Sequence, residues 1–373
     1  MAITIDIEKA KKVANDAISK RKLVKDAIGK NISYILRAFH KTYRYVLVTE
    51  LLAKATDERI DILSLQAQDE SEGAYDARSV GHKVIVPIER EEFPFSLGNS
   101  NEPFLNNPAR QPRLSLDNAV KGKNDREILK LCIDTLSQIK TSKDAFRYLC
   151  SAFSDMETIS NEIQFKYSVE GINFDGNNHV QSILDYIYIL TDEPKEGEIC
   201  PLIIASIEQF YLRETYRVEP HKVNESGASP REVGDIDIFD SKKKLVSSIE
   251  VKDKDFAKED VGHAIRKFMD AKLERSFFIY GKNVSWDKES VYQLVSRFGR
   301  IGHFCCVISV LNYSKMRLTH ISDNITLKSF SEMMLRFAKQ IKVHDETIDW
   351  IKNALIKMKL KTAVKNIQEG NKS

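Results

Sequence analysis

The chain has 373 residues, of which 42% are hydrophobic and 30% charged, a composition typical of folded globular proteins that excludes a disordered chain. Its densest apolar run, residues 304–311, is far shorter than the roughly 20 residues of a membrane-spanning helix, and the first residues lack the apolar region of a secretory signal peptide. We therefore expect a cytoplasmic protein with no membrane partner, and the formal net charge of +3 does not by itself indicate a nucleic-acid binder.

The first part of the chain is predicted to be helical and rich in loops. Apolar residues recur at helical spacing in "VLVTELLAKA", and helical patterns return at residues 126–139 and 144–153. Between these patterns, residues 96–116 contain three prolines, four asparagines and a glycine, which excludes a long regular element. We assign residues 1–155 to a helical and loop-rich N-terminal region.

From about residue 201 the pattern changes to alternating helices and strands. Residues 201–218 are predicted to form a helix, and "VGDIDIFD" and "KLVSSIEVKD" to form two strands. The amphipathic helix "DVGHAIRKFMDAKLER" and the apolar strands "SFFIYG" and "FCCVISVLNY" follow. This order predicts an α/β (α+β) core with a mixed β-sheet flanked by helices, at residues 156–325, followed by a C-terminal helical region at residues 326–373.

Charge is distributed unevenly along the chain. Residues 1–44 carry 11 Lys or Arg against 4 Asp or Glu, and residues 328–373 carry 10 against 5. Residues 155–200 carry 2 Lys against 10 Asp or Glu. The basic ends are able to form a surface that faces phosphates, although solvated helix faces are the simpler interpretation.

The five cysteines indicate a reducing compartment and no zinc site. They are scattered, odd in number, and form no C-x-x-C pair. Zinc sites in proteins need paired ligand spacings that this chain lacks.

Two of the predicted strands carry carboxylates in a common phase. Asp235 and Asp237 share one face of the first strand, and Glu250 and Lys252 share one face of the second, since side chains alternate along a strand. If the strands pair, Asp235, Glu250 and Lys252 converge on one side of the sheet. Carboxylate oxygens are Mg²⁺ ligands, and Mg²⁺ activates water and stabilises negative charge on a phosphate. A nearby lysine is able to orient or deprotonate the water, or to neutralise charge.

The spacing of these residues is permissive, because an Asp followed by Glu-x-Lys arises by chance in a chain of this length. The sequence context is more informative. Both halves lie in apolar strand patterns, a glycine precedes the Asp, and a helix and another strand follow. A solvated charged hairpin without catalytic function is the alternative.

At these residues the sequence resembles the PD-(D/E)xK nuclease superfamily, with Glu250 placed 15 positions after Asp235. The N-terminal half adds "YVLVTELLAKATDERIDILSL", "YDARSVGHKVIVP" and "LGNSNEPFLNNPAR". Together they are similar to the SacI-type family of type II restriction endonucleases, from the first helices to about Gly281. The resemblance implies a restriction-endonuclease-like core that makes Mg²⁺-dependent double-strand cuts at a short palindrome, leaving 5′-phosphate and 3′-hydroxyl ends.

The resemblance also implies roles for individual residues. Asp235, Glu250 and the backbone carbonyl of Val251 would bind Mg²⁺, and Lys252 would act on the nucleophilic water. Asp237 is a departure from the family pattern, and it is either a residue behind the metal ligands or a solvated strand residue.

Many enzymes of this superfamily add an acidic residue from the helix before the first catalytic strand. Glu208, 27 positions before Asp235, is the candidate here, and Glu214 is the alternative. An ordinary exposed helix glutamate is the competing interpretation.

Sequence-specific cutting needs contacts to base edges, for which Arg, Lys, Asn and Gln are suited. The loop of residues 96–116, called the Asn-rich loop from here on, and the preceding "YDARSVGHK" supply such residues on a scaffold. Asn and Pro, however, commonly serve turns. The favoured candidates for DNA binding are Arg78, Lys83, Asn106, Asn107 and Arg110. Further candidates are Asn99, Asn101, Gln111, Arg113 and His82 in the same segments, and His263, Arg266 and Lys267 as phosphate contacts.

The expected partners are double-stranded DNA, a second copy of the chain, since a palindrome matches a two-fold dimer, and a cognate DNA methyltransferase as a genetic partner. Two other functions stay open. One is a nuclease of the same fold in DNA repair or modification-dependent restriction. The other is a DNA-binding module without catalysis.

Overall fold

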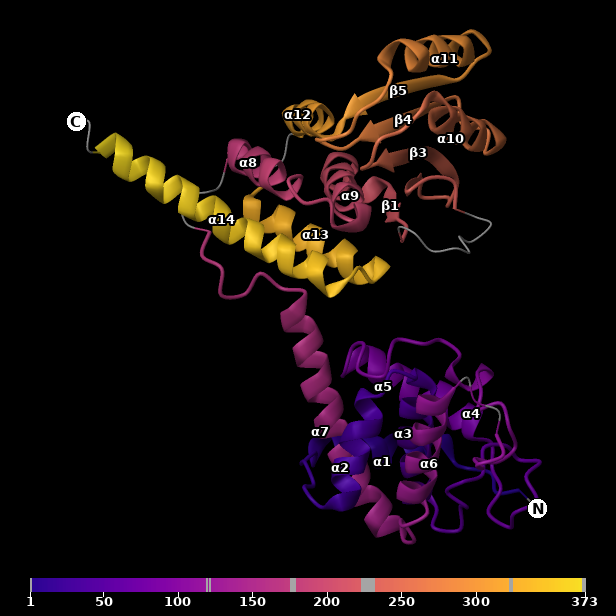
Figure 1. Ribbon diagram of the computed structural model, residues 1–373. Helices are drawn as coiled ribbons and strands as arrows, with labels where there is room; N and C mark the ends of the chain where they lie inside the picture. Colours follow the sequence, from indigo (N-terminus) through magenta and orange to yellow (C-terminus); the bar gives the residue numbers. More distant parts are fainter. Residues whose placement is uncertain are drawn as a thin grey trace. The chain divides into compact units, whose positions relative to one another are not determined.

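The computed structural model describes residues 2–118, 120, 122–174, 179–222, 232–321 and 325–370, and the side chains of these up to residue 358. The chain forms two compact units, Met1–Gln164 and Phe165–Ser373 (Figure 1). Each unit has its own hydrophobic core.

The first unit is helical. Its helices are α1 (Ile7–Ser19), α2 (Ala27–Arg37), α3 (Lys41–Thr56), α4 (Ala77–Val80), α5 (Val86–Glu91), α6 (Lys123–Leu136) and α7 (Ser142–Lys166). A single π-helical turn, η1 (Gly81–Ile85), joins α4 to α5. Within the predicted loop 96–116 the only helical segment is the short 3₁₀-helix η2 (Pro103–Leu105), which agrees with the composition of that loop.

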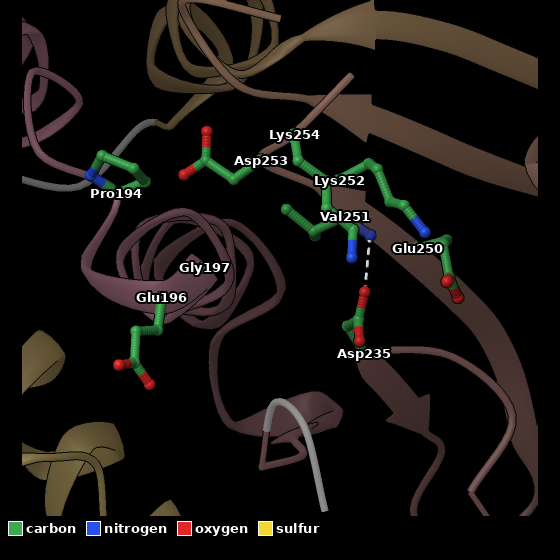
Figure 2. A pocket seen from close by; sticks show the side chains of 9 residues that line it. All are labelled: Pro194, Glu196, Gly197, Asp235, Glu250, Val251, Lys252, Asp253 and Lys254. Carbon is green, nitrogen blue, oxygen red and sulfur yellow. Dashed lines mark hydrogen bonds between the residues drawn. The ribbon is translucent and has the colours of Figure 1, made fainter. Parts of the chain in front are cut away.

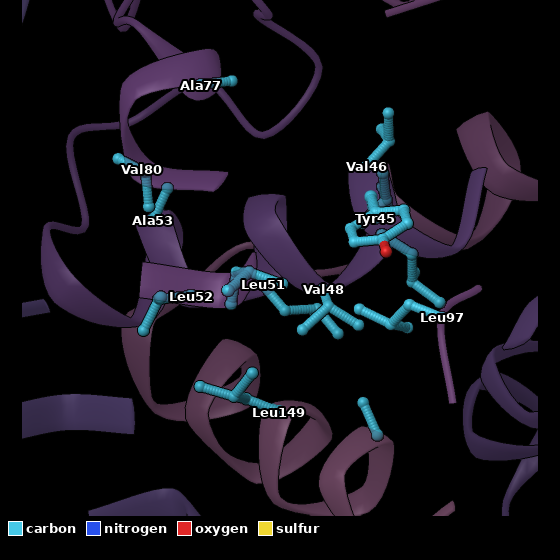
Figure 3. Close-up of a cluster of buried hydrophobic side chains, with 14 of the residues drawn as sticks. Tyr45, Val46, Val48, Leu51, Leu52, Ala53, Ala77, Val80, Leu97 and Leu149 are labelled. Carbon is cyan, nitrogen blue, oxygen red and sulfur yellow. The ribbon is translucent and has the colours of Figure 1, made fainter. Parts of the chain in front are cut away.

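Helix α3 is the centre of the first unit. It is apolar around most of its circumference, and eleven of its residues are buried. A helix with this pattern is stable only when other elements surround it. Figure 3 shows Val48, Leu51 and Leu52 of α3 beside Leu149 of α7 and Leu97 of the Asn-rich loop.

The second unit contains a five-stranded mixed sheet in the order β1-β2-β3-β4-β5. Strands β1 (Arg217–Pro220), β2 (Ile236–Phe239) and β3 (Leu245–Lys252) are antiparallel neighbours. Strands β4 (Arg275–Tyr280) and β5 (Phe304–Ser309) continue the sheet in parallel with β3. The fold is therefore mixed α/β, as the sequence predicts.

Helices cover both faces of this sheet (Figure 1). Ile249 and Val251 of β3 face a core built with α8 (Val180–Leu190), α9 (Ile199–Leu212) and α12 (Val310–His320). Phe278 of β4 faces the opposite core, built with α10 (Lys258–Asp270) and α11 (Lys288–Arg300).

The C-terminal helices belong to the same unit. Helix α13 (Leu327–Ile341) packs on α9, and α14 (Asp345–Gly370) packs on α8. The Trp350 indole N–H donates to the carbonyl of Leu190 at 3.0 Å, which fixes α14 to the end of α8.

Two elements differ from the sequence-based prediction. The predicted helix 201–218 ends at Leu212, because Arg213 adopts a left-handed φ of 58°, and β1 follows. Helix α11 was not predicted, although Asp287 caps it by accepting hydrogen bonds from the backbone N–H groups of Glu289 and Ser290. Within the described residues, no helix is long and apolar enough to cross a membrane.

A buried glutamate in α3 provides a test of the first core. Glu50 is fully buried, and within the described residues neither of its carboxyl oxygens has a hydrogen-bond partner. Burial raises the pKa of Glu50 well above its usual value, opposed by the Tyr75 hydroxyl beside it. Burial therefore favours the protonated form of Glu50 in the folded protein, relative to the unfolded chain.

We predict that Glu50→Gln stabilises the protein at pH 8 and changes little at pH 4. A carboxyl whose pKa is raised on folding costs stability as the pH rises above the unfolded-state pKa, at about 1.4 kcal/mol per unit of pKa difference. Thermal unfolding at both pH values measures the difference. The matched control is Glu127→Gln at an exposed position of α6, and a variant less stable than the parent at pH 8 would contradict the prediction.

Candidate active site

The antiparallel register of β2 and β3 brings the predicted acids together. Ile236 pairs with Ile249 and Asp237 with Ser248, so Asp235, the residue before β2, lies opposite Glu250. The two carboxylates therefore emerge on the same side of the sheet. Lys252 lies two residues further along β3 on that side.

Asp235 is held at the point where the β2–β3 ladder ends. One of its carboxyl oxygens accepts a hydrogen bond of 2.7 Å from the backbone N–H of Val251 (Figure 2). The N–H and C=O of one strand residue point toward the same neighbour, so the Val251 carbonyl is directed to the Asp235 side as well.

Gly234 explains why a glycine precedes this aspartate. A Cβ at Gly234 would lie 2.5 Å from the Ser248 hydroxyl and 2.7 Å from the Ile249 carbonyl oxygen. The chain therefore passes directly over β3 at this point, and a larger residue would displace Asp235 from its position.

Glu250 has a strongly perturbed acidity. Burial and the neighbouring charge of Asp235 raise its pKa to about 7, against the attraction of Lys267 and Lys252. Burial also raises the pKa of Asp235. The Lys267 ammonium of α10 lies 4.0 Å from Glu250, which places one of the predicted phosphate contacts beside the acids.

Lys252 is anchored by the helix that follows β3. Its ammonium lies 3.2 Å from a carboxyl oxygen of Asp260, and Asp260 also accepts a hydrogen bond from the backbone N–H of Ala257 at the start of α10. The lysine thus has a defined position next to the acids.

The structure places Asp237 in a buried network and not in the open part of the site. Its side chain is fully buried and accepts hydrogen bonds from the Ser248 hydroxyl at 2.6 Å and from the backbone N–H groups of Val233 and Gly234. The His221 ring lies 3.0 Å away as a further partner. Burial raises the pKa of Asp237, but these partners outweigh burial and keep the pKa below its usual value. Asp237 therefore fixes the turn that carries Asp235.

A cavity of about 430 Å³ opens at the carboxyl end of β3 (Figure 2). Asp235, Glu250 and Lys252 line one part of it, and the turn Pro194–Gly197 before α9 lines another part. The cavity is also lined by the carboxylates of Glu196 and Asp253, which the sequence analysis did not single out. Asp253 packs so closely on Gly281 that a Cβ there would lie 1.7 Å from its carboxyl oxygen.

The donor set fits a hard divalent cation. Asp235 and Glu250 offer carboxylate oxygens and Val251 offers a carbonyl oxygen, which is the oxygen-only chemistry of Mg²⁺ sites. Two half-buried carboxylates with raised pKa values repel each other and gain from a shared cation. Among the described residues no group of three or more His, Cys, Asp or Glu side chains gathers at metal-binding distances, so such a cation would take further oxygen ligands from water and phosphate.

Glu208 does not reach this cavity. It lies on α9, which packs on the opposite face of the sheet, and its carboxylate accepts a hydrogen bond of 2.6 Å from the Tyr313 hydroxyl. The Arg317 guanidinium lies 2.8 Å from the same carboxylate. Glu208 therefore joins α9 to α12. The alternative, Glu214, is exposed in a 3₁₀ turn and does not line the cavity either.

The favoured DNA-binding candidates lie in the first unit, whereas the proposed phosphate contacts His263, Arg266 and Lys267 lie on α10 of the second unit. Arg78 is on α4, Lys83 is on the π-helical turn η1, and both are exposed. Asn106, Asn107 and Arg110 are exposed in the Asn-rich loop.

Other residues proposed for that loop have structural partners. Arg113 is paired with Asp61 and with Asp69, and the Asn101 side chain accepts a hydrogen bond from Arg90. The backbone N–H of Asn99 donates to Glu89 at 2.9 Å.

Comparison with known families agrees with both units. The model of the SacI restriction endonuclease N-terminal domain matches residues 7–160, and that of the SacI restriction endonuclease C-terminal domain matches residues 177–282. No curated protein matches the chain. The two matched domains occur in the same order as the helical unit and the sheet-containing unit and cover most of the chain, so the protein belongs to the SacI restriction endonuclease family.

Proposed function

We propose that the protein is a type II restriction endonuclease that uses Mg²⁺ to cut both strands of DNA at a short palindrome. The observation that carries this proposal is the register-fixed cluster of Asp235, Glu250 and Lys252 in an open cavity. Family membership supports a nuclease acting on DNA. The use of Mg²⁺, the hydrolysis of both strands and the recognition of a palindrome are all parts of this proposal.

Each residue of the cluster has a defined task in phosphodiester hydrolysis. Asp235, Glu250 and the Val251 carbonyl would hold Mg²⁺, which supplies charge stabilisation on the phosphate and a lowered pKa for water. Lys252 orients the attacking water and neutralises charge at the phosphate. The water oxygen bonds to phosphorus and releases one proton to solvent. The bond between phosphorus and the 3′ oxygen breaks, and that oxygen takes up a proton from solvent. The products carry 5′-phosphate and 3′-hydroxyl ends.

A palindromic site favours a homodimer, because two active sites related by a two-fold axis meet both strands in the same way. A nuclease of this kind works in the cytoplasm beside the host DNA. It needs a cognate methyltransferase as a genetic partner that protects the host sites.

We predict that Glu250→Gln and Lys252→Ala each lower the cleavage rate by at least about 100-fold, because the first removes a proposed Mg²⁺ ligand and the second removes the cation beside the reacting phosphate. DNA binding is retained. Incubation with genomic DNA of known sequence and Mg²⁺, followed by sequencing of the ends, measures cleavage, and omission of Mg²⁺ abolishes it. Glu259→Gln, an exposed position of α10, is the matched control. If both variants cleave DNA at the parent's rate, the cluster has no catalytic role and is only a solvated charged hairpin.

Asp235→Asn and Asp237→Asn are predicted to have opposite effects on stability. Asp235→Asn removes a desolvated charge while its amide oxygen still accepts from Val251, so stability is kept or raised while cleavage is lost. Asp237→Asn turns an N–H group toward a site surrounded by donors and costs about 1–3 kcal/mol. Thermal unfolding without Mg²⁺ compares the two. Equal destabilisation would show that Asp235 is as structural as Asp237.

Glu208→Gln is predicted to lower stability without altering the chemistry. It removes the charge that pairs with Arg317 in a nearly buried contact, which costs on the order of 3 kcal/mol. The cleavage rate per folded molecule stays within about two-fold of the parent enzyme, because the residue lies on the other face of the sheet. Glu214→Gln is the exposed control. A loss of cleavage with unchanged thermal unfolding would assign Glu208 to the active site instead.

A further inference from the structure

Another hollow lies on the first unit. Its residues are distant in the sequence from the carboxylate cluster, which belongs to the second unit. The hollow has a volume of about 620 Å³. Its polar lining comes from Gln66, Gln68, Asp76, Arg78 and Arg110, with Leu105 as an exposed apolar neighbour. Gln66 and Gln68 carry no motif, and sequence reasoning did not select them.

The hollow is built by a close contact between α4–η1 and the Asn-rich loop. A Cβ on Gly81 would lie 2.5 Å from the ring of Phe104, so the glycine leaves space for this ring. Phe104 is buried there, in η2. The contact brings the loop that carries Arg110 to the helix that carries Arg78.

A buried carboxylate fixes the start of the loop. One oxygen of Glu89 accepts hydrogen bonds from the backbone N–H groups of Leu97, Gly98 and Asn99 at 2.8–2.9 Å. The other oxygen accepts a hydrogen bond from the Tyr45 hydroxyl of α3. Gly98 and Asn99 both have positive φ values, so the chain turns sharply around this carboxylate.

The end of the loop is fixed to the segment that carries the two glutamines. The backbone N–H groups of Leu65 and Gln66 both donate to the carbonyl of Pro112. The Gln66 side-chain amide donates to the carbonyl of Arg110 at 2.8 Å and accepts from the amide of Gln68 at 2.5 Å. Gln66 therefore holds both Arg110 and Gln68, and their own side chains stay exposed.

We propose that this hollow reads base edges in the major groove, with Arg110 and Gln68 as the specificity-determining side chains and Gln66 as the residue that positions them. The inference rests on the proposed function, since it names where that nuclease reads its site. Arg matches the two acceptors of guanine, and Gln matches the acceptor and donor of adenine. Such recognition needs side chains held on a rigid scaffold, which the three anchors of the loop supply.

A second property of the hollow is that Arg78, which lines it, is paired with Glu102, which does not line it. The Glu102 carboxylate lies 3.1 Å from Arg78 and 3.7 Å from the ring of His82. An acidic group on a DNA-facing surface repels the phosphate backbone, and an exposed ion pair of this kind is easily exchanged for another partner. Glu102 therefore occupies Arg78 until a phosphate or guanine edge displaces it, which lowers binding to unrelated DNA.

The test uses random duplex DNA selected for binding to the full-length protein, alongside cleavage of genomic DNA with Mg²⁺. For Gln68→Ala and Arg110→Ala we expect a 5- to 150-fold loss of affinity for the parent's preferred sequence, with preference relaxed at one base pair and its symmetry mate. Thermal unfolding should match that of the parent. The matched controls are Gln138→Ala, at an exposed position just after α6, and Arg126→Ala, at an exposed position on α6.

Selection of the same sequence with the same strength by both variants would overturn the inference while leaving the nuclease intact. If the parent protein cuts no DNA but still selects a sequence through Gln68 and Arg110, the proposed nuclease function would be overturned. The inference that the hollow contacts base edges would be supported. A parent that neither cuts nor selects DNA would overturn both.

Glu102→Gln tests the second property. We expect it to bind unrelated duplexes at least about five-fold more tightly than the parent does, with a steeper loss of binding as salt is raised, because Arg78 is released for phosphate contact. Glu127→Gln removes the same charge from an exposed position of α6 that does not line the hollow. If both variants bind unrelated duplexes equally tightly, Glu102 acts only through the net charge of the protein and not through its pairing with Arg78.

Discussion

The pairing of β2 with β3 is the constraint on which the candidate active site depends. A strand register fixes which side chains lie opposite each other, and a slip of one residue would send every side chain to the other face. Here the register places Asp235 opposite Glu250, and Asp237 secures it by binding Ser248 of β3 and the turn before β2 at once. Asp237, whose carboxylate oxygens are engaged in hydrogen bonds, thus stabilises the geometry in which the less fully hydrogen-bonded Asp235 and Glu250 face each other.

This arrangement stores an electrostatic cost in the active site. Asp235 and Glu250 are both partly withdrawn from water and both have raised pKa values. The nearby ammonium groups of Lys252 and Lys267 reduce this cost without removing it. Sites in which like charges repel each other are common where a protein binds a charged ligand, and the divalent cation proposed above, with its phosphate, would relieve this repulsion.

Much of the second unit could be predicted from the sequence, because its signals are local. The alternation in "GDIDIF" and "SIEVK" determines which residues share a face, and the apolar patterns of α10, β4 and β5 are strong. Other features depend on contacts between distant residues. Strand β1 is only four residues long and was merged with the helix before it. Glu208 occupies a suitable position in the sequence, but α9 turns it toward Tyr313 and Arg317 on the far face. Gln66 and Gln68 have no pattern at all, and their role appears only when the loop ending at Pro112 folds back onto them.

The buried carboxylates of this chain show how structural and functional acids are distinguished. Glu89, Asp237 and Glu208 are each buried with several donors, and each joins two segments that are distant in the sequence. Within the described residues, Asp235 accepts one backbone hydrogen bond, and Glu250 lies 4.0 Å from the Lys267 ammonium. A buried acid whose hydrogen-bonding capacity is filled has no oxygen left for a metal or a substrate, so its identity as an acid reflects the fold. Asp235 and Glu250 are only half-buried, but an acid with unfilled capacity that is partly withdrawn from water is also costly to keep. The cation proposed for this cavity would offset that cost. Glu50 is an exception to this distinction, because it lies in the apolar core of the first unit and burial there favours its protonated form.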